Sequence, residues 1–149
     1  MKQIILITAL LLGLSARAQQ DGFGLGVIIG EPTGLSFKKF ISDDKAIDGA
    51  LAWSFRGEGS LHIHADVLWH KFDLINVNKG RLPLYFGIGG RISTPEHHDT
   101  HFGLRIPVGL AYMFDGAPLD VFLEVVPILD LVPDSDVSFN GAFGLRFYL

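Results

Sequence analysis

The chain ends in an alternating stretch, VSFNGAFGLRFYL, at residues 137–149. Large apolar side chains share one face of this stretch: Val137, Phe139, Phe143, Leu145, Phe147 and Leu149. Small or polar side chains such as Ser138, Asn140 and Arg146 share the other face. Side chains that alternate with a period of two are typical of a β-strand whose two faces meet different surroundings. The end of the chain therefore predicts a strand with one apolar face.

The same alternation recurs along the chain, and turn sequences rich in Gly, Pro, Asp and Asn separate most of the alternating stretches. The predicted strands are 22–30, 34–41, 46–56, 60–72, 82–93, 102–114, 119–132 and 137–149. Short connections force neighbouring strands to run antiparallel. No segment after residue 18 approaches the run of about 18 apolar residues that a membrane-spanning helix needs. We therefore predict an all-β fold, an eight-stranded antiparallel up-and-down transmembrane β-barrel, over residues 19–149.

Residues 1–18 have the features of a cleaved signal peptide. Lys2 places a positive charge at the N-terminus, residues 4–14 are apolar, and Ala16-Arg17-Ala18 is a small-x-small cleavage signal. The chain has no cysteine, which excludes disulfides, thiolate metal sites and a lipid-anchored lipoprotein. We therefore expect an exported protein of a Gram-negative envelope.

The composition of the second face decides between a soluble barrel and a membrane barrel, because a membrane barrel points its apolar face at lipid. That face is crowded with small residues: Gly24, Gly26, Ser36, Ala50, Ala52, Ser54, Gly87, Gly89, Gly103, Gly109, Ala111 and Ala142. Such residues suit the narrow interior of an eight-stranded barrel. The apolar face carries aromatic residues near the strand ends, which predict two interfacial bands: Phe23, Trp53, Phe55, Trp69, Phe102, Tyr112 and Phe114. We predict an outer-membrane barrel with its N-terminus in the periplasm; a soluble periplasmic barrel is the alternative.

Charged residues of both signs also lie on the inward face: Lys38, Asp48, Asp66, Arg91, Arg105, Asp120, Glu124, Asp130 and Arg146. Because an unpaired buried charge is strongly destabilising, we predict an ion-pair network in the lumen. Neighbouring strands would pair Arg105 with Glu124 and Asp120 with Arg146. Since side chains fill a barrel of eight strands, the network is expected to plug the lumen. The alternative is a narrow channel for ions or small solutes.

Histidines suggest a second, weaker site. His62 and His64 share the inward face with Asp66, and His97, His98 and His101 lie in the following loop at the same end. Imidazole and carboxylate groups in such a set could bind Zn²⁺ or Cu²⁺. The alternative is hydrogen bonding in the lumen together with a solvated loop, and no cofactor is expected.

Other classes of function fit less well. A net charge of −4 without a basic cluster argues against nucleic-acid binding. A lipid-modifying enzyme needs a nucleophile, a base and an acid that reach the lipid, and no outward set of this kind is present.

Pro107 and Pro127 lie in the middle of predicted strands, where a missing N–H removes a ladder bond. They predict a local bulge or an unpaired stretch.

Six short motifs are spread over residues 19–149. They are 30–38 (GEPTGLSFK), 61–66 (LHIHAD), 86–89 (FGIG), 105–110 (RIPVGL), 122–133 (FLEVVPILDLVP) and 144–148 (GLRFY). Together they resemble a family of small uncharacterised bacterial outer-membrane β-barrels, similar in architecture to the OmpA transmembrane domain. Compared with OmpA, shorter extracellular loops and no periplasmic domain are expected. The resemblance implies a structural or interaction role in the outer membrane. The expected partners are lipids and the barrel assembly machinery, and the protein is expected to be a monomer. The resemblance implies no enzymatic activity and no catalytic residue.

Overall fold

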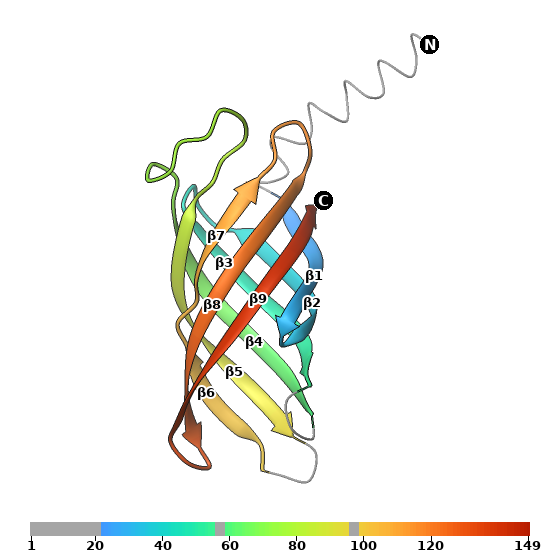
Figure 1. The fold of residues 1–149 in the computed structure, drawn as a ribbon, viewed down its shortest axis with the longest axis vertical. Coiled ribbons are helices and arrows are strands. Elements are labelled where there is room, and N and C mark those ends of the chain that lie inside the picture. Colours follow the sequence, from blue (N-terminus) through green and yellow to red (C-terminus); the bar gives the residue numbers. More distant parts are fainter. Residues whose placement is uncertain (1–21, 56–58, 96–98) are drawn as a thin grey trace, which may run out of the picture.

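A computed structural model describes residues 22–55, 59–95 and 99–149, which form one antiparallel sheet that closes on itself (Figure 1). The strands are β1 (Phe23–Glu31), β2 (Thr33–Phe40), β3 (Lys45–Ser54), β4 (Ser60–Lys71), β5 (Leu84–Pro95), β6 (His101–Arg105), β7 (Val108–Met113), β8 (Leu119–Val132) and β9 (Asp136–Tyr148). Their order is β4-β3-β2-β1-β9-β8, then β6 and β7, then β5, which pairs with β4 again. Because β6 and β7 together occupy one place in the ring, the prediction of an eight-stranded antiparallel barrel is confirmed. The predicted signal peptide, 1–18, lies outside the described residues.

The barrel has two unlike ends. At the upper end in Figure 1, the start of β1 lies beside the end of β9, and the Leu149 backbone N–H donates to the Phe23 carbonyl at 2.9 Å. We call this the terminal end; the connections β2–β3, β4–β5 and β7–β8 also lie there. The opposite end, with the connections β1–β2, β3–β4, β5–β6 and β8–β9, is called the mouth. Among the described residues, no helix is long and apolar enough to cross a membrane.

The predicted strand boundaries agree with the structure to within two residues, except for the sixth strand. The predicted strand 102–114 is divided into β6 and β7 by Ile106 and Pro107. Opposite this break lies Pro127, in the middle of β8. Pro127 lies directly opposite Ile106, so the two prolines are diagonal neighbours in the sheet.

Each proline leaves a ladder position with one hydrogen bond in place of two. The Ile106 N–H donates to the Pro127 carbonyl at 3.0 Å, and the Gly87 N–H donates to the Pro107 carbonyl at 2.9 Å. Proline has no N–H with which to return either bond. The expected unpaired stretch is thus present only in part, because one bond remains at each position.

A bulge at these prolines, the other outcome expected, is wrong. Arg105 pairs with Ile128 and Val108 pairs with Val125, so the register against β8 is the same on both sides of the break. The irregularity in this strand pair lies nearer the mouth, at Phe102 and the residue that follows it.

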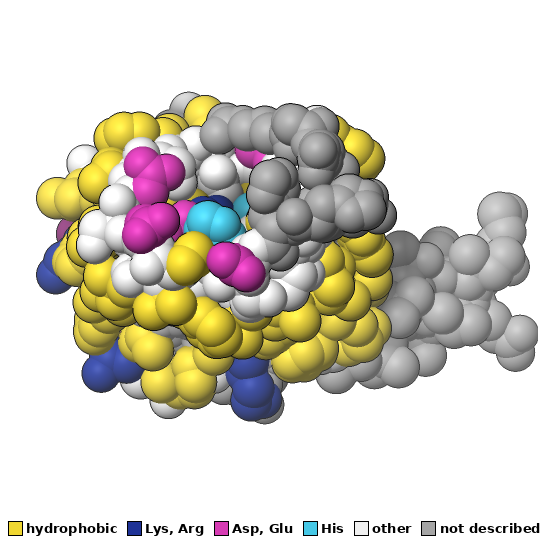
Figure 2. Space-filling view, turned by 90° about the horizontal axis from the view of Figure 1, so that it is seen from below, with side chains coloured by type: hydrophobic (Ala, Val, Ile, Leu, Met, Phe, Trp, Pro, Cys, Tyr) yellow, Lys and Arg dark blue, Asp and Glu magenta, His cyan; other side chains and the backbone are white. Residues whose placement is uncertain are grey.

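Burial confirms the predicted division of the two faces. Outward residues such as Leu123 and Phe139 are each 60% exposed, whereas the inward Arg105 and Arg146 are 1% and 2% exposed. Figure 2 looks into the mouth and shows apolar side chains around the outer wall and charged side chains around the opening. The core therefore lies inside the barrel, where Tyr85 joins smaller apolar side chains.

Candidate functional site

Buried charged side chains meet inside the barrel in three clusters. The mouth cluster contains Arg91 and Asp130. Arg91, on β5, donates to both carboxylate oxygens of Asp130, on β8, with Nε–Oδ1 at 3.1 Å and Nη2–Oδ2 at 2.7 Å. His101 Nδ1 lies 3.6 Å from Oδ2 of the same carboxylate. A bidentate arginine–carboxylate pair is a strong and directional contact, so it fixes both side chains across the opening.

The middle cluster is centred on Arg105. Its Nε lies 3.0 Å from Asp66 Oδ1, and its Nη2 lies 3.2 Å from Asp66 Oδ2 and 3.7 Å from Glu124 Oε2. The Tyr85 hydroxyl donates to Glu124 Oε1 at 3.0 Å. The Arg105 side chain is 1% exposed and that of Asp66 is not exposed. One cation therefore holds two carboxylates in the centre of the lumen.

The terminal cluster is centred on Arg146. Its Nη2 lies 3.2 Å from Asp48 Oδ2 and its Nη1 lies 3.9 Å from Asp120 Oδ1. The guanidinium carbon lies 3.9 Å from the centre of the Phe122 ring. The Tyr148 hydroxyl donates to Asp120 Oδ2 at 2.5 Å. The cation thus meets two carboxylates and an aromatic face, a favourable setting for a buried arginine.

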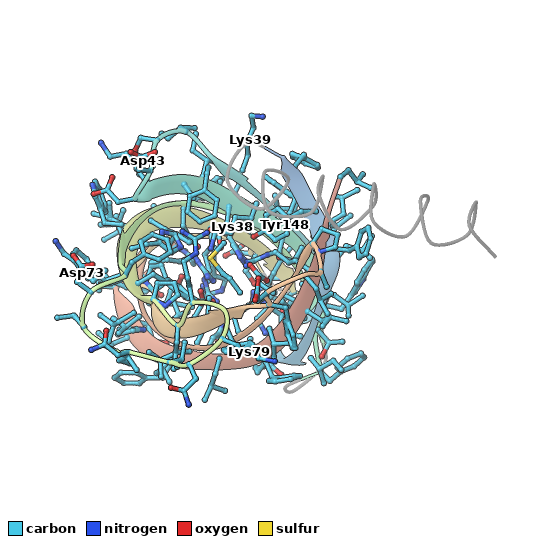
Figure 3. The ribbon with its side chains drawn as sticks, turned by 90° about the horizontal axis from the view of Figure 1, so that it is seen from above. Lys38, Lys39, Asp43, Asp73, Lys79 and Tyr148 are labelled. Carbon is cyan, nitrogen blue, oxygen red and sulfur yellow. The ribbon has the colours of Figure 1, made fainter. Side chains whose placement is uncertain are left out.

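Lys38 differs from the other eight charged residues predicted to line the lumen. Its Nζ lies 2.7 Å from His70 Nε2, and it also lies over the rings of Phe40, at 4.9 Å, and Tyr85, at 5.3 Å. No carboxylate within the described part of the chain lies within 4 Å of Lys38 Nζ. Figure 3, seen from the terminal end, shows Lys38 inside the ring together with Tyr148.

The structure brings both predicted pairs together, but each arginine has a closer partner elsewhere. Arg105 is 3.7 Å from Glu124, and Arg146 is 3.9 Å from Asp120. The shorter contacts cross the lumen, to Asp66 from two strands away and to Asp48 from three strands away. Sequence reasoning found the charges but not these contacts, which depend on the curvature of the sheet.

Inward glycines provide recesses for particular side chains. A Cβ atom on Gly89 would overlap the Asp66 carboxylate, and one on Gly103 would overlap that of Asp130. The small residues of the inner face therefore do more than fit a narrow lumen. They make room for the carboxylates that bind Arg105 and Arg91.

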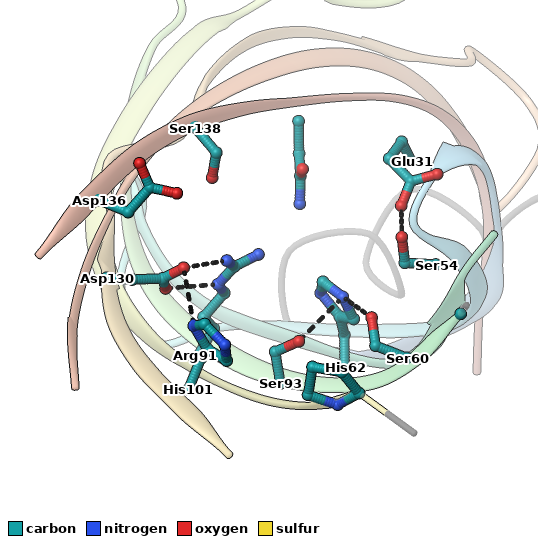
Figure 4. Close-up of a pocket in the computed structure, with 13 residues that line it drawn as sticks. Glu31, Ser54, Ser60, His62, Arg91, Ser93, His101, Asp130, Asp136 and Ser138 are labelled. Atoms are coloured by element: carbon teal, nitrogen blue, oxygen red, sulfur yellow. Dashed lines mark hydrogen bonds and ion pairs between the residues drawn. The ribbon is translucent and has the colours of Figure 1, made fainter. Parts of the chain in front are cut away.

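A chamber of about 420 Å³ opens at the mouth (Figure 4). It is lined by side chains from both walls of the barrel, among them Glu31, Ser54, His62, Arg91, Ser138 and Asn140. Ser54 donates to Glu31. His62 Nε2 lies 2.8 Å from the Ser60 hydroxyl and 3.3 Å from that of Ser93. Figure 2 shows this hollow from outside, with acidic and histidine side chains in it.

The chamber narrows sharply towards the middle cluster. A void of about 10 Å³ is lined by Arg105, Glu124 and Asn140. This is about the room that one water molecule needs. The wide part of the lumen therefore ends on the mouth side of Arg105.

The histidines do not form a metal site in the described part of the chain. His62 and His64 are buried on the inner face of β4, and His101 lies beside Asp130. Within 22–55, 59–95 and 99–149, no group of three or more His, Asp or Glu side chains could hold a metal ion. His97 and His98 lie outside the described residues, so their part of the metal prediction stays a prediction.

Sequence analysis missed the contact of His62 with two serines. His62 and Ser93 are directly opposite in the β4–β5 pair, so the hairpin register would have revealed this contact. A serine beside a histidine suggests a nucleophile and its base, but His62 Nδ1 has no hydrogen-bond partner among the described residues. In a catalytic triad an acid orients the imidazole through that atom. The pair also points into the lumen, away from lipid, so it does not support a lipid-modifying enzyme.

The closed antiparallel ring, with an apolar exterior and paired charges inside, defines a small up-and-down β-barrel. The structure is similar to the N-terminal β-barrel domain of Pseudomonas aeruginosa OprF, with a TM-score of 0.64 and 15% sequence identity. The match covers 87% of this chain and 98% of that chain. No protein-family model and no curated protein matches the chain. At this identity the likeness shows the fold, and it confirms the expected architecture.

Proposed function

We propose that this chain is an integral outer-membrane β-barrel protein with a lumen closed by ion pairs and a structural or interaction role. The observation that carries the proposal is the outer wall. Among the described strands, the outward-facing charged side chains are Lys39, Lys45 and Lys71, all at strand ends near the terminal end. The wall between them and the mouth is apolar, as contact with lipid requires.

Aromatic side chains at both ends support a membrane position. Trp53 and Phe102, near the mouth, are 49% and 48% exposed, and Phe23, at the terminal end, is 39% exposed. Lys45 Nζ lies 5.6 Å from the centre of the Trp69 ring, also at the terminal end. Aromatic rings and long lysine side chains favour the boundary between lipid and water. The two bands would then mark the two surfaces of the bilayer.

The three clusters support a closed lumen. Arg91, Arg105 and Arg146 each bind a carboxylate across the barrel, and the void beside Arg105 has about the volume of one water molecule. Because the sheet has no free edge, it offers no strand for pairing with another copy. Membrane lipids and the assembly machinery are the proposed partners, and the proposed form is a monomer.

Separation of the cell envelope tests the proposed location. The protein should fractionate with the outer membrane, and without boiling it should run in gel electrophoresis as a compact band that shifts on heating. Release into the periplasmic fraction without detergent would instead identify a soluble barrel and overturn the proposal.

A narrow channel is the second candidate, because the mouth chamber extends inward to Arg91 and narrows only on the mouth side of Arg105. Planar-bilayer conductance of the natural protein and of Arg105→Ala separates the two functions. A closed lumen predicts no steady conductance for the natural protein and lower heat stability for the variant. A channel predicts steady conductance in the natural protein, altered by the variant without loss of heat stability.

A further inference from the structure

We propose that the mouth chamber binds a small uncharged molecule rich in hydroxyl groups, of about the size of a monosaccharide. The chamber of about 420 Å³ lies within the range of roughly 300–1,000 Å³ typical of ligand pockets. The proposal goes beyond a structural role, and it holds whether or not the lumen conducts.

Three neutral polar groups in the chamber lack a hydrogen-bond partner within the described part of the chain. They are His62 Nδ1, Ser138 Oγ and Asn140 Nδ2. His62 and Asn140 are each only 5% exposed. Folded proteins pair nearly all their buried polar groups, because an unpaired one is destabilising. Three such groups in one chamber therefore indicate positions at which a ligand binds.

The three groups lie on opposite walls. His62 is on β4, whereas Ser138 and Asn140 are on β9. Figure 4 shows His62 and Ser138 pointing into the chamber from facing sides. The hydroxyls of Ser60 and Ser93 contact Nε2 of the His62 ring, so Nδ1 is the ring nitrogen that remains without a partner among the described residues. A molecule between the two walls can therefore contact both strands.

The charged groups of the chamber indicate which ligands it accepts. Arg91 already donates two bonds to Asp130, and Glu31 already accepts a bond from Ser54. The unpaired buried groups are an amide, a hydroxyl and an imidazole, which as a set both donate and accept hydrogen bonds. Alcohol hydroxyls do the same. The ligand is therefore bound through hydroxyl groups and not through an ion pair.

The same charges disfavour anions. Glu31, Asp130 and Asp136 line the chamber together with one arginine, Arg91. The excess of carboxylates repels a phosphate or a carboxylate on the ligand. A neutral sugar should therefore bind more tightly than its phosphorylated form.

NMR titration of the barrel refolded in detergent micelles tests the proposal. The probes are glucose, mannose and glycerol as neutral compounds, glucose 6-phosphate as the anion and putrescine as the cation. We expect saturable amide shifts at Ser93, Ser138 and Asn140 with at least one neutral probe. Glucose 6-phosphate should bind at least tenfold more weakly than glucose or not at all.

Variants link binding to the unpaired groups. Asn140→Ala should weaken binding of the neutral probe at least fivefold, and Ser138→Ala provides a second variant if the first does not refold. Asn78→Ala is the matched control, because Asn78 is exposed in the loop at the terminal end. The proposal is overturned if none of the neutral probes gives saturable shifts, if Asn140→Ala and Ser138→Ala bind as the natural chain does, or if putrescine binds most tightly.

Discussion

The Arg105 guanidinium on β6 binds the Asp66 carboxylate on β4 at 3.0 Å, although β5 lies between these two strands in the sheet. The contact crosses the lumen where neither side chain is exposed by more than 1%. A buried ion pair inside the lumen therefore stabilises the barrel, in addition to the backbone hydrogen bonds between its strands. Asp66 is the closest carboxylate to Arg105; Glu124 is 3.7 Å away.

Asp66→Asn should lower the stability of the barrel strongly. The substitution removes the charge of the nearer carboxylate and leaves the more distant one, Glu124 at 3.7 Å, beside Arg105, and breaking one side of a buried ion pair typically costs about 3–5 kcal/mol. Urea unfolding of the refolded protein measures the loss. Asp73→Asn, in the exposed loop at the terminal end, should change the free energy of unfolding by less than about 0.5 kcal/mol. Equal changes in the free energy of unfolding for the two substitutions would show that the Arg105–Asp66 contact does not stabilise the barrel.

Two adjacent glycines should respond in opposite ways to alanine. In Gly89→Ala the new methyl group would overlap the Asp66 carboxylate and the Ala65 backbone carbonyl. Overpacking of this kind typically costs about 1–3 kcal/mol. In Gly90→Ala the methyl group faces outward, 3.7 Å from the Gly103 carbonyl oxygen, and stability should be unchanged or slightly higher. Heat-induced unfolding midpoints compare the two, and a greater loss for Gly90→Ala would contradict the inward position of Gly89.

The strands were predictable because alternation is a local property of the sequence. The alternation over 119–132 predicts β8 with its observed bounds, and residues 137–149 predict β9 with each bound displaced by one residue. The interruption at Pro107 was also visible, since a missing N–H affects its own strand. Whether it produced a bulge depended on the register with β8, which the sequence of one strand does not contain.

The site was predictable only in part, for the same reason. Inward charges follow from alternation, so the charged residues could be named. Their closest partners could not, because Arg146 reaches Asp48 three strands away, and that contact depends on how the sheet curves. The chamber groups Ser138 and Asn140 are inconspicuous in the sequence, because only the closed barrel places them opposite His62.

Pro127→Ala should add one hydrogen bond to the sheet. The Pro127 carbonyl accepts from the Ile106 N–H at 3.0 Å, and in this antiparallel pair an N–H at position 127 would point back to the Ile106 carbonyl. The new amide should be protected from hydrogen exchange as strongly as those of its neighbours in β8. Stability should change little, since a gain of about 0.5–1.5 kcal/mol from the bond is offset by a more flexible unfolded chain. Rapid exchange at position 127 would show that β8 and the β6–β7 connection are not closely paired there.

Arginine substitutions on the outer wall separate a wall that faces lipid from one that faces water. Val125, in the middle of β8, is 55% exposed, and Val137, near the mouth on β9, is 63% exposed. Arginine on the lipid face costs about 2–4 kcal/mol at the middle of a bilayer and roughly 0–1 kcal/mol near its surface. Val125→Arg should therefore destabilise the barrel in lipid vesicles far more than Val137→Arg, as measured by denaturant titration. A wall that faces water would accept arginine at both positions, so equal free energies of unfolding would contradict the membrane location.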